Sequence, residues 1–390
     1  MKLGFFSNYL NHHQVLVADE FYRLLGDNFR FVATLPVNEM ELKGGADYTK
    51  RPYCILAAEN DETQAMALSL SREAEVCVFG ACSQEFAVER AKHNPKALSF
   101  EMGERWLKHG LLTIGSPIFR KWFLNYLRYY RRANFYKLCC SSYTSIDDRR
   151  VYAYLNRHYK WGYFTDVSNA CGEDLRKCRA DTNSTEVRLM WCARLLKLKH
   201  PELPVILAAK LKKEGYRFVI NIYGDEKNLL PSNKVYFSKD LKSLIDKLGV
   251  ADVVNMKGSY PNSQILQAMR EHDIFLFTSD RNEGWGVVAN EAMSNNCCLV
   301  SSDAIGSSHY LLNDGVNGFI FKNRSIESLY DKVKYLFDHP LERKIMAERG
   351  AQDMFNIWSP KVAAKNLLQL IRDLNSGHQT SIIDGPCSKA

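Results

Sequence analysis

Short apolar runs alternate with amphipathic stretches along this chain, and the alternation occurs in two series. An apolar run of about 4–8 residues is typical of a strand covered on both faces, as in a parallel sheet with helical crossovers. The expected strands of the first series are Leu3–Phe6, Phe29–Thr34, Val76–Phe79, Ala97–Phe100 and Lys137–Cys140. Those of the second series are Val187–Trp191, Phe218–Ile222, Val253–Met256, Ile274–Thr278, Cys298–Ser301 and Phe319–Phe321. The pattern predicts an α/β fold with two doubly wound parallel sheets in succession.

Amphipathic stretches with helical spacing lie between these strands. In the first series they are Val15–Leu25, Thr63–Arg72, Gln84–Lys92, Ile118–Ala133 and Asp147–Leu155. In the second series they are Pro201–Glu214, Asp240–Lys247, Ser263–Glu271, Val287–Ser294 and Ile326–Phe337. A last amphipathic stretch, Val362–Leu374, follows Trp358-Ser359-Pro360 and closes the pattern.

The length of 390 residues is too great for one ordinary core and predicts two domains of similar size. The first strand–helix series ends near Trp161–Phe164. We therefore place the first domain at residues 1–165 and the second at residues 166–357. Residues 358–376 are expected to form a closing helix, and the polar residues 377–390 a flexible tail.

The composition is that of a soluble globular protein, with 46% hydrophobic and 25% charged residues. No stretch reaches the roughly 18–20 apolar residues that span a bilayer, and because the polar Ser7-Asn8 comes soon after the start, we expect no secretory signal. The eleven cysteines lack paired metal spacing, and Cys139-Cys140 and Cys297-Cys298 lie in apolar strand contexts. We therefore expect a cytoplasmic protein with reduced, buried thiols.

The net charge of +8 is concentrated between Arg105 and Ile146, where no acidic residue occurs. The basic residues of this window are Arg105, Lys108, Arg120, Lys121, Arg128, Arg131, Arg132 and Lys137. Between them lie the aromatic residues Trp106, Phe119, Trp122, Phe123, Tyr126, Tyr129, Tyr130, Phe135 and Tyr136. Such a mixture at residues 105–137 fits a surface that docks on anionic lipid headgroups, peripherally on the inner face of the cell membrane. The alternative is a helix whose aromatic residues face the core and whose arginines are solvated.

A nucleic-acid patch is a third interpretation of the same basic window. No recognised nucleic-acid-binding motif accompanies the charge, so we expect no nucleic-acid partner.

A strand, a loop with two glycines and a helix follow one another after the apolar run Ile274–Phe277. The loop and helix read Thr278-Ser279-Asp280-Arg281-Asn282-Glu283-Gly284-Trp285-Gly286-Val287-Val288-Ala289-Asn290-Glu291-Ala292-Met293. The glycines allow the backbone to approach a ligand closely, and the helix start offers N–H groups and a positive dipole end to an anion. Glu283 and Glu291 can both face a crevice at the carboxyl end of the strand. A ligand that carries both a diphosphate and hydroxyl groups, such as a nucleotide sugar, fits this arrangement.

The spacing Glu283-x7-Glu291, with Gly284-x-Gly286 inside it, resembles the donor-site motif of retaining GT-B glycosyltransferases of family 4 (glycosyl transferases group 1), of the polysaccharide-assembly type. The simpler alternative is a helix start that carries acidic residues only because of its dipole. The resemblance implies a GT-B fold, in which two Rossmann-like domains face each other across a cleft. The first domain would bind the acceptor and the second the nucleotide sugar. The closing helix would pack back on the first domain.

The resemblance extends to the segment after the first strand of the second domain. Ala193-Arg194-Leu195-Leu196-Lys197-Leu198-Lys199 is similar to the family's Gly-Arg-(x4)-Lys segment, with Ala193 in place of glycine. In the family the Arg and Lys clamp the donor diphosphate, which gains negative charge as the glycosidic bond breaks. Arg194 and Lys199 are therefore the expected catalytic cations, and Glu283 is the third expected catalytic residue. Lys197 is the competing cation, and ordinary surface charge is the alternative for all three.

The family's donor-binding roles are carried over to the matching positions. Glu291 would accept hydrogen bonds from the ribose, and Glu283 would lie beside the donor sugar hydroxyls. The backbone N–H groups of the loop would hold sugar and phosphate oxygens; these belong to Gly284, Trp285, Gly286 and Val287. Trp285 could stack on a sugar or serve packing only. Gly224 matches a close-approach glycine, and Met256 lies in the segment whose backbone frames the base.

Polar loops of the first domain are the candidates for the acceptor side. His12 and His13 follow the first strand, and because they would lie in the first turn of a helix, at most one is expected to be functional. Glu101 and Glu104 occupy a place where many family members have a histidine near the reacting sugar. Both could equally be acidic residues that match the dipole of a helix start.

The resemblance implies a hexosyltransferase-type enzyme that transfers a sugar with retention of anomeric configuration. Retention would follow a front-face mechanism, in which the departing diphosphate takes the proton of the acceptor hydroxyl, so no protein nucleophile is needed. We expect no metal ion and no other cofactor, because Arg, Lys and helix N–H groups stabilise the leaving group. The expected acceptor is a glycan or polyprenyl-linked glycan of a bacterial surface polysaccharide. The donor's base and sugar, and the linkage formed, stay open.

Two alternative functions remain. One is another GT-B enzyme, such as a nucleotide-sugar epimerase, which acts on the donor without an acceptor. The other is a non-catalytic nucleotide-binding assembly partner. Arg194, Lys199, Glu283 and Glu291 argue against the latter.

Overall fold

The computed structural model describes residues 1–36, 48–168, 186–226 and 234–390. The chain divides into two compact units. The first unit comprises Met1–Thr165 and Ile357–Ala390, and the second comprises Asp166–Asn356. Each unit is built on its own parallel sheet with helices on both faces, which confirms the predicted fold class.

The sheet of the first unit has seven parallel strands in the order β3-β2-β1-β4-β5-β6-β7. The strands are β1 (Leu3–Ser7), β2 (Phe29–Ala33), β3 (Cys54–Leu56), β4 (Val76–Phe79), β5 (Ser99–Gly103), β6 (Phe135–Cys139) and β7 (His158–Lys160). The central strands are apolar because helices cover both of their faces; β1 and β4 are buried along their whole length. The strand order reverses between β1 and β4, which makes their carboxyl ends a natural binding edge.

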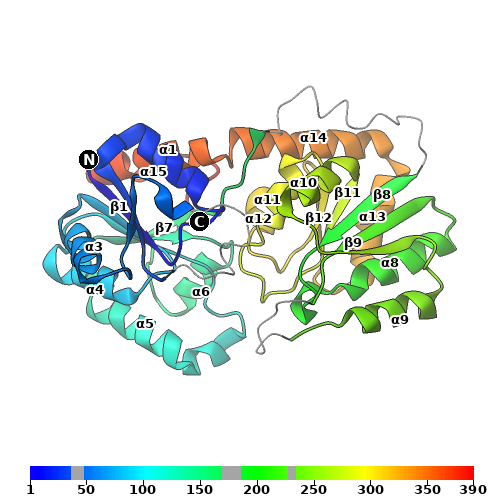
Figure 1. Cartoon of the computed structure of the whole chain (residues 1–390), viewed down its shortest axis with the longest axis horizontal. Coiled ribbons are helices and arrows are strands. Elements are labelled where there is room, and N and C mark those ends of the chain that lie inside the picture. The colour runs from blue at the N-terminus through cyan, green and yellow to red at the C-terminus, as the bar shows by residue number, and fades with distance from the viewer. Residues whose placement is uncertain (37–47, 169–185, 227–233) are drawn as a thin grey trace. The chain divides into compact units, whose positions relative to one another are not determined.

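Helices cover the two faces of this first sheet (Figure 1). The helices of the unit are α1 (Val15–Leu25), α3 (Asp61–Glu73), α4 (Gln84–His93), α5 (Pro117–Arg128), α6 (Thr144–Arg150) and α15 (Pro360–Asn375). Helix α15 packs against α1, so the last helix belongs to the first unit. Helices α3, α4 and α5 share one apolar core with the other face of the sheet, around Phe6, Phe86 and Trp122.

The second unit has a six-stranded parallel sheet in the order β10-β9-β8-β11-β12-β13. Its strands are β8 (Val187–Cys192), β9 (Phe218–Tyr223), β10 (Val254–Gly258), β11 (Ile274–Phe277), β12 (Cys298–Ser302) and β13 (Phe319–Phe321). The order reverses between β8 and β11, which lie side by side. This reversal places the loops after β8 and β11 at one edge of the sheet.

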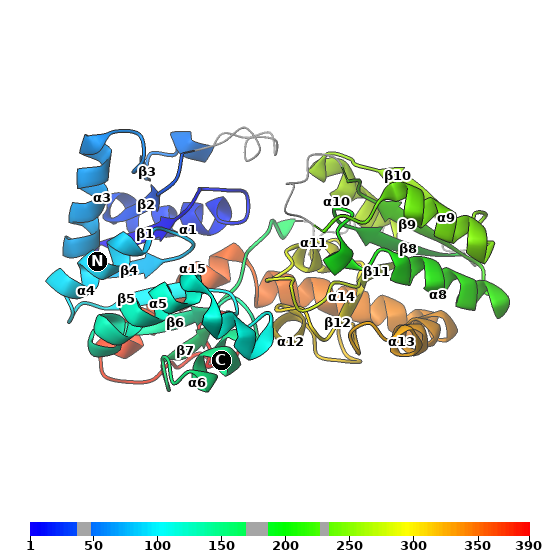
Figure 2. The ribbon, with the colours of Figure 1, turned by 90° about the horizontal axis from the view of Figure 1, so that it is seen from below.

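Two layers of helices enclose the second sheet. The helices are α8 (Glu202–Lys213), α9 (Ser238–Leu248), α10 (Asn262–Glu271), α11 (Val288–Ser294), α12 (Ser308–Leu311), α13 (Ile326–Asp338) and α14 (Pro340–Asn356). Figures 1 and 2 show α8 beside α9, and α8 also packs on α13 over an apolar core. Helices α10, α11 and α14 pack together in the other layer.

Four short or weakly patterned elements of the described residues were missing from the predictions, among them α12, which spans only four residues. Strands β3 and β7 each span three residues, too few for a periodic signal, and β7 includes the buried polar His158. Helix α14 buries mainly small or flexible residues such as Gly350 and Met354, so its apolar stripe is hard to recognise. The predicted helix Ile118–Ala133 ends as an α-helix at Arg128, and Asp147–Leu155 is replaced by a shorter helix, α6.

The tail expected to be flexible is instead held on the first unit at its last residues. Cys387 and Ser388 are buried, the N–H of Lys160 donates to the carbonyl of Ser388 at 2.8 Å, and Lys389 pairs antiparallel with Tyr159. The prediction was wrong because the edge of the sheet at β7 leaves backbone groups that the tail can satisfy.

The basic stretch at residues 105–137 does not act as one solvated surface. Arg105 pairs with the buried Asp147 at 3.1 Å, and Lys137, whose side chain is 1% exposed, pairs with Glu101 at 2.8 Å. These two cations stabilise the interior and are unavailable to lipid. Arg120, Lys121, Arg128, Arg131 and Arg132 are exposed.

Within the described ranges no helix has the length and apolar character required to cross a membrane. The nine cysteines of the described part of the chain are free thiols. Six of them are buried: Cys77, Cys139, Cys140, Cys297, Cys298 and Cys387.

Candidate active site

The loops after β8 and β11 meet at the point where the strand order of the second sheet reverses. The ammonium of Lys199, from the loop after β8, donates a hydrogen bond to the carboxylate of Glu283, from the loop after β11. Both side chains are largely buried, at 13% and 14% exposed. The carboxyl edge at such a reversal is where open α/β sheets bind ligands. The structure therefore brings together two of the three predicted catalytic residues.

Hydrogen bonds between buried groups fix the two loops against each other. The indole of Trp191 donates to the Thr278 hydroxyl at 2.8 Å, and that hydroxyl donates to the carbonyl of Lys199 at 2.7 Å. The N–H of Asp280 donates to the carbonyl of Leu198 at 2.8 Å. Because these contacts join the backbones, the Lys199–Glu283 pair is held on rigid supports.

A buried carboxylate, Asp280, anchors the loop that carries Glu283. It accepts hydrogen bonds from Arg324 at 2.8 Å and from the backbone N–H of Asn282 at 2.9 Å, and it pairs with His200 at 3.4 Å. Burial opposes ionisation, but these hydrogen bonds hold the pKa of Asp280 well below its usual range. Burial also opposes the charged form of His200, yet Asp280 and Glu202 raise the pKa of this imidazole to about 9. Near neutral pH the site edge thus contains a protonated His200 between two carboxylates.

Glu291 lies on α11 behind the loop. Its carboxylate accepts a hydrogen bond from the Asn262 side chain at 3.4 Å. Burial raises the pKa of Glu291 to about 7, and the Asn262 contact opposes this shift only in part. A carboxylate with so few described partners retains lone pairs for a polar ligand.

Two glycines form close backbone contacts that no side chain could enter. Gly224 follows β9 with φ +130°, and a Cβ there would lie 1.8 Å from the carbonyl oxygen of Ala193. Gly286 has φ +81°, and a Cβ there would lie 2.3 Å from the ring of Phe277. Ala193 has no such left-handed backbone, so alanine is compatible with this position. Gly224 directly follows β9, and Gly286 lies two residues before α11.

The side chain of Trp285 packs in the interior of the second unit. The indole is 1% exposed and donates to the side-chain oxygen of Asn290 at 2.8 Å. It is therefore not placed as a platform for a sugar ring. The backbone of the same loop is fixed by Gly284, whose carbonyl accepts from the N–H of Gly306 at 3.1 Å, and Val287 is the N-cap of α11.

Arg194 follows β8 and Met256 lies on β10, and strand β9 lies between these two strands in the sheet. Arg194 is exposed in the loop after β8, two residues beyond the strand's end. Met256 lies on β10 at the border of the sheet, and its side chain packs against the core of the unit. Arg194 is thus open to solvent, and the side chain of Met256 is partly buried.

The first-unit histidines differ from the prediction. His12 and His13 lie in a turn before α1, with ring centroids 3.6 Å apart, so the two rings share one side of the chain. The expectation that adjacent side chains here point in different directions is wrong, whereas the functional role of either histidine stays a prediction. Burial lowers the pKa of His13 to about 3, and the adjacent His12 adds to this effect. His13 is therefore neutral at physiological pH.

Glu101 lies on β5 itself and not at a helix start, so the dipole interpretation is wrong for this residue. Its carboxylate accepts from Lys137, from the Trp122 indole at 2.7 Å and from the Tyr154 hydroxyl at 2.5 Å. Glu104 pairs with Lys108 at 3.1 Å.

Glu101 and Glu104 both line a cavity of about 470 Å³ in the first unit. The cavity lies at the carboxyl ends of β4 and β5, and Trp106, Tyr130 and Tyr163 contribute aromatic surface to it. The hydroxyl of Tyr130 is buried and has no hydrogen-bond partner among the described residues. A cavity with aromatic walls and polar groups can accept a sugar ring.

Sequence reasoning missed the residues that support the donor edge. Asp280 and Thr278 lie inside the quoted motif, but their partners His200 and Arg324 are 80 and 44 residues from Asp280. Asn262, which follows the N-cap Pro261 at the start of α10, donates to Glu291 and was not among the predicted site residues. The one available signal was the carboxylate of Asp280, three residues after the apolar run Ile274–Phe277, where an acidic group requires partners.

Residues 177–353 match the model of the family Glycosyl transferases group 1. This segment carries the Lys199–Glu283 pair, Gly224 and Glu291. No curated protein matches the sequence of the chain.

Several solved structures share the fold of the whole chain. HepE of Anabaena (Alr3699), in complex with UDP, superposes with a TM-score of 0.69 at 15% identity over 96% of this chain and 100% of that chain. A glycosyltransferase from Rickettsia africae gives a TM-score of 0.65 at 15% identity, with 96% and 99% covered. Sucrose-phosphate synthase of Thermosynechococcus elongatus gives 0.67 at 12% identity, with 97% and 100% covered. At these identities the likeness shows the fold, which is GT-B.

Proposed function

Because residues 177–353 match the model of the family Glycosyl transferases group 1, we propose that this protein is a retaining glycosyltransferase of the hexosyltransferase type. It moves a sugar from a nucleoside diphosphate sugar to a hydroxyl of a glycan or lipid-linked glycan. The observation that carries the proposal is the Lys199–Glu283 pair at the strand reversal of the second sheet.

The proposed chemistry uses positive charge at the leaving group. As the glycosidic bond breaks, the departing nucleoside diphosphate gains negative charge, which Lys199 and Arg194 stabilise together with backbone N–H groups at Gly284–Val287. Glu283 lies beside the donor sugar and positions its hydroxyls, while Glu291 accepts from the ribose. When the donor binds, its phosphate replaces part of the Lys199–Glu283 contact.

The acceptor hydroxyl attacks the anomeric carbon on the face from which the diphosphate leaves. Its proton passes to a diphosphate oxygen, and the new glycosidic bond therefore has the configuration of the donor. Because two cations stabilise the leaving group, we propose that no metal ion and no other cofactor is required.

The first experiment measures nucleotide release from UDP-, GDP-, ADP- and CMP-sugars, with thermal shift in parallel. HepE was solved with UDP-glucose, so a UDP-sugar is the first donor to test. We expect one donor to raise the unfolding temperature and to be hydrolysed slowly, with and without EDTA. No release and no thermal shift with any donor would contradict the proposal and favour a non-catalytic assembly partner. Isomerisation of the donor without transfer would favour an epimerase.

The proposed acceptor is a polyprenyl-linked glycan of a bacterial surface polysaccharide. Support comes from the exposed face of the first unit, where Leu111, Leu112 and Ile118 lie near the exposed cations of α5. Apolar side chains beside arginines and lysines suit an anionic membrane surface. The enzyme would therefore work in the cytoplasm and bind peripherally to the inner face of the cell membrane, where lipid-linked acceptors are found.

A further inference from the structure

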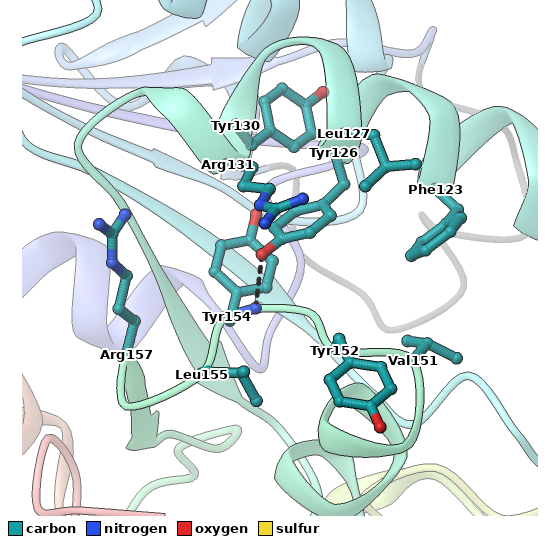
Figure 3. Close-up of a pocket in the computed structure, with 10 residues that line it drawn as sticks. All are labelled: Phe123, Tyr126, Leu127, Tyr130, Arg131, Val151, Tyr152, Tyr154, Leu155 and Arg157. Atoms are coloured by element: carbon teal, nitrogen blue, oxygen red, sulfur yellow. Dashed lines mark hydrogen bonds between the residues drawn. The ribbon is translucent and has the colours of Figure 1, made fainter.

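A cavity of about 540 Å³ opens on the first unit between the last turns of α5 and the loop 151–157 (Figure 3). This volume falls within the range of about 300–1,000 Å³ that is typical of small-molecule sites. None of the predicted donor or acceptor residues lines it. The cavity is thus distinct from the donor edge and from the cavity that contains Glu101.

The walls of this cavity combine apolar and cationic groups. Phe123, Leu127 and Tyr152 lie on one side of the view in Figure 3, Arg157 lies on the other, and Arg131 is near the centre. No carboxylate is found among the residues that line it, all of which belong to the described part of the chain. A ligand with an apolar chain and an anionic head matches both kinds of wall.

The loop that closes the cavity is strained but firmly held. Three of its non-glycine residues, Tyr152, Tyr154 and Asn156, have positive φ angles of 56°, 49° and 63°. Such a conformation is unfavourable for a residue with a Cβ and persists only where surrounding contacts determine it. Here the N–H of Tyr154 donates to the Tyr126 hydroxyl at 2.9 Å. The loop therefore forms a fixed wall, and it presents Tyr152 and Leu155 outward.

Two contacts link this cavity with the one that contains Glu101. Tyr130 lines both cavities. Tyr154 lines the first, and its hydroxyl donates to Glu101, which lines the second. A molecule that occupies the first cavity therefore touches the residue that orients Glu101.

We infer that this cavity binds the isoprenoid end of the acceptor's lipid carrier, with its phosphate at Arg131 and its chain against Phe123, Leu127 and Leu155. The inference rests on the proposed function, because it assigns the lipid end of the proposed acceptor to this site. The Tyr154–Glu101 link favours the acceptor lipid over a bilayer phospholipid, since the bound carrier would lie next to the cavity suited to a sugar. The guanidinium of Arg157 donates to the carbonyls of Ala133 and Phe135, at 3.2 and 3.3 Å, so this second cation is held in place in the wall of the cavity.

The test is calorimetric titration of the full chain with farnesyl phosphate, a short isoprenoid phosphate. Farnesol and inorganic phosphate each carry one of its two features. We expect farnesyl phosphate to bind about tenfold or more tightly than either, because the chain and the charge contribute together. Equal binding of farnesol and farnesyl phosphate would overturn the role of Arg131.

Matched variants locate the site. Arg131→Glu and Leu155→Asp should each weaken binding of farnesyl phosphate about tenfold or more. Arg128→Glu and Leu124→Asp change exposed residues of α5 that do not line the cavity. These two variants should alter the affinity for farnesyl phosphate less than about twofold. If all four variants weaken binding alike, the lipid is held by the general surface, and the inference is overturned.

A further measurement distinguishes the acceptor lipid from bilayer lipid, and distinguishes failure of this inference from failure of the proposed function. A soluble short-chain phosphatidylglycerol should bind about tenfold more weakly than farnesyl phosphate; tighter binding would assign the cavity to bilayer lipid. Donor thermal shift, measured on the same samples, reports on the donor edge alone. A donor shift without farnesyl phosphate binding defeats only this inference, whereas lipid binding without any donor shift defeats only the proposed function.

Discussion

The ammonium of Lys199 lies against the carboxylate of Glu283, although the two residues are 84 positions apart in the chain. Two largely buried opposite charges stabilise each other, and removal of one leaves the other desolvated without compensation. The pair is also where the proposed leaving group would bind. Its two roles can be separated by comparison of stability with activity.

Lys199→Ala is expected to lower the rate constant of donor cleavage by about 10²–10³-fold, because it removes a cation that acts on the leaving group. Glu283→Ala should also lose activity. The increase in activation free energy in the double variant should be much smaller than the sum of the increases in the two single variants. Steady-state kinetics with the identified donor measures this. Lys197→Ala, an exposed lysine of the same turn, is the control and should retain activity. Full activity in Lys199→Ala or Glu283→Ala would refute the site.

Glu291 should make donor binding depend on pH. Its pKa is raised to about 7 by burial, and only the ionised form accepts two hydrogen bonds from the ribose. Ionisation increases with pH, so donor affinity should be about tenfold higher at pH 8 than at pH 6. Calorimetric titration at the two pH values measures the difference. Glu291→Gln should bind weakly with no such dependence, and an unchanged pH profile in that variant would exclude Glu291 as the titrating group.

His200 should stabilise the fold at low pH. Its pKa is raised to about 9 in the folded protein, against about 6.5 when unfolded, so its contribution is complete below pH 6.5 and is lost as the pH rises through 9. The loss should reach up to about 3 kcal/mol. Urea unfolding at pH 6 and pH 9.5 measures it. His200→Asn tolerates the left-handed backbone at φ +51° and should show a smaller loss between these pH values. Equal losses in both proteins would contradict the assignment.

Gly224→Ala should destabilise the second unit severely. The new Cβ would lie 1.8 Å from the carbonyl oxygen of Ala193, and the backbone at φ +130° suits glycine alone. We expect a loss of more than about 3 kcal/mol in the free energy of unfolding. Gly249→Ala is the matched control, because Gly249 also has positive φ but nothing lies within 4 Å of the added Cβ; about 1–2 kcal/mol is expected there. Similar losses for both would show that the Ala193 contact is unimportant.

The exposed face of the first unit should bind anionic vesicles. Leu112 is 87% exposed, and its change to Asp removes apolar contact with the bilayer, so binding should fall about tenfold. Flotation with vesicles that contain phosphatidylglycerol measures this. Leu341→Asp is the control, since Leu341 is 69% exposed but belongs to the second unit. Binding that survives charge reversal of Arg128, Arg131 and Arg132 together would refute a role for these cations.

The strands were largely predictable because buried parallel strands are continuous apolar runs. Val76–Phe79 and Phe319–Phe321 match the observed strands residue for residue, and helix Val15–Leu25 matches α1. Strands β3 and β7 escaped because three residues carry no period. Whether a cation such as Lys137 is buried depends on a partner, Glu101, that lies on a different strand. No local pattern reveals such a partner.

The donor edge was predicted only where a motif linked residue types to chemistry. Glu283 and Glu291 lie in one motif and Lys199 in another, and the strand reversal between β8 and β11 explains why these motifs meet. The contacts of Asp280 with His200 and Arg324 follow from the three-dimensional fold. His12 and His13 lie in the turn before α1 and not inside the helix, and the sequence did not indicate that their rings would lie together.

The first unit contains residues that precede the second unit in the sequence and residues that follow it, and its last helix, α15, packs on α1. During synthesis, the strands of residues 1–165 therefore emerge long before the helix that covers α1. At about 5–20 residues per second, translation of the intervening second unit takes on the order of 10–40 s. During this interval the apolar face of α1 lies open to chaperones and to other nascent chains. The first unit therefore cannot complete its packing until α15, the last helix of the chain, has been synthesised.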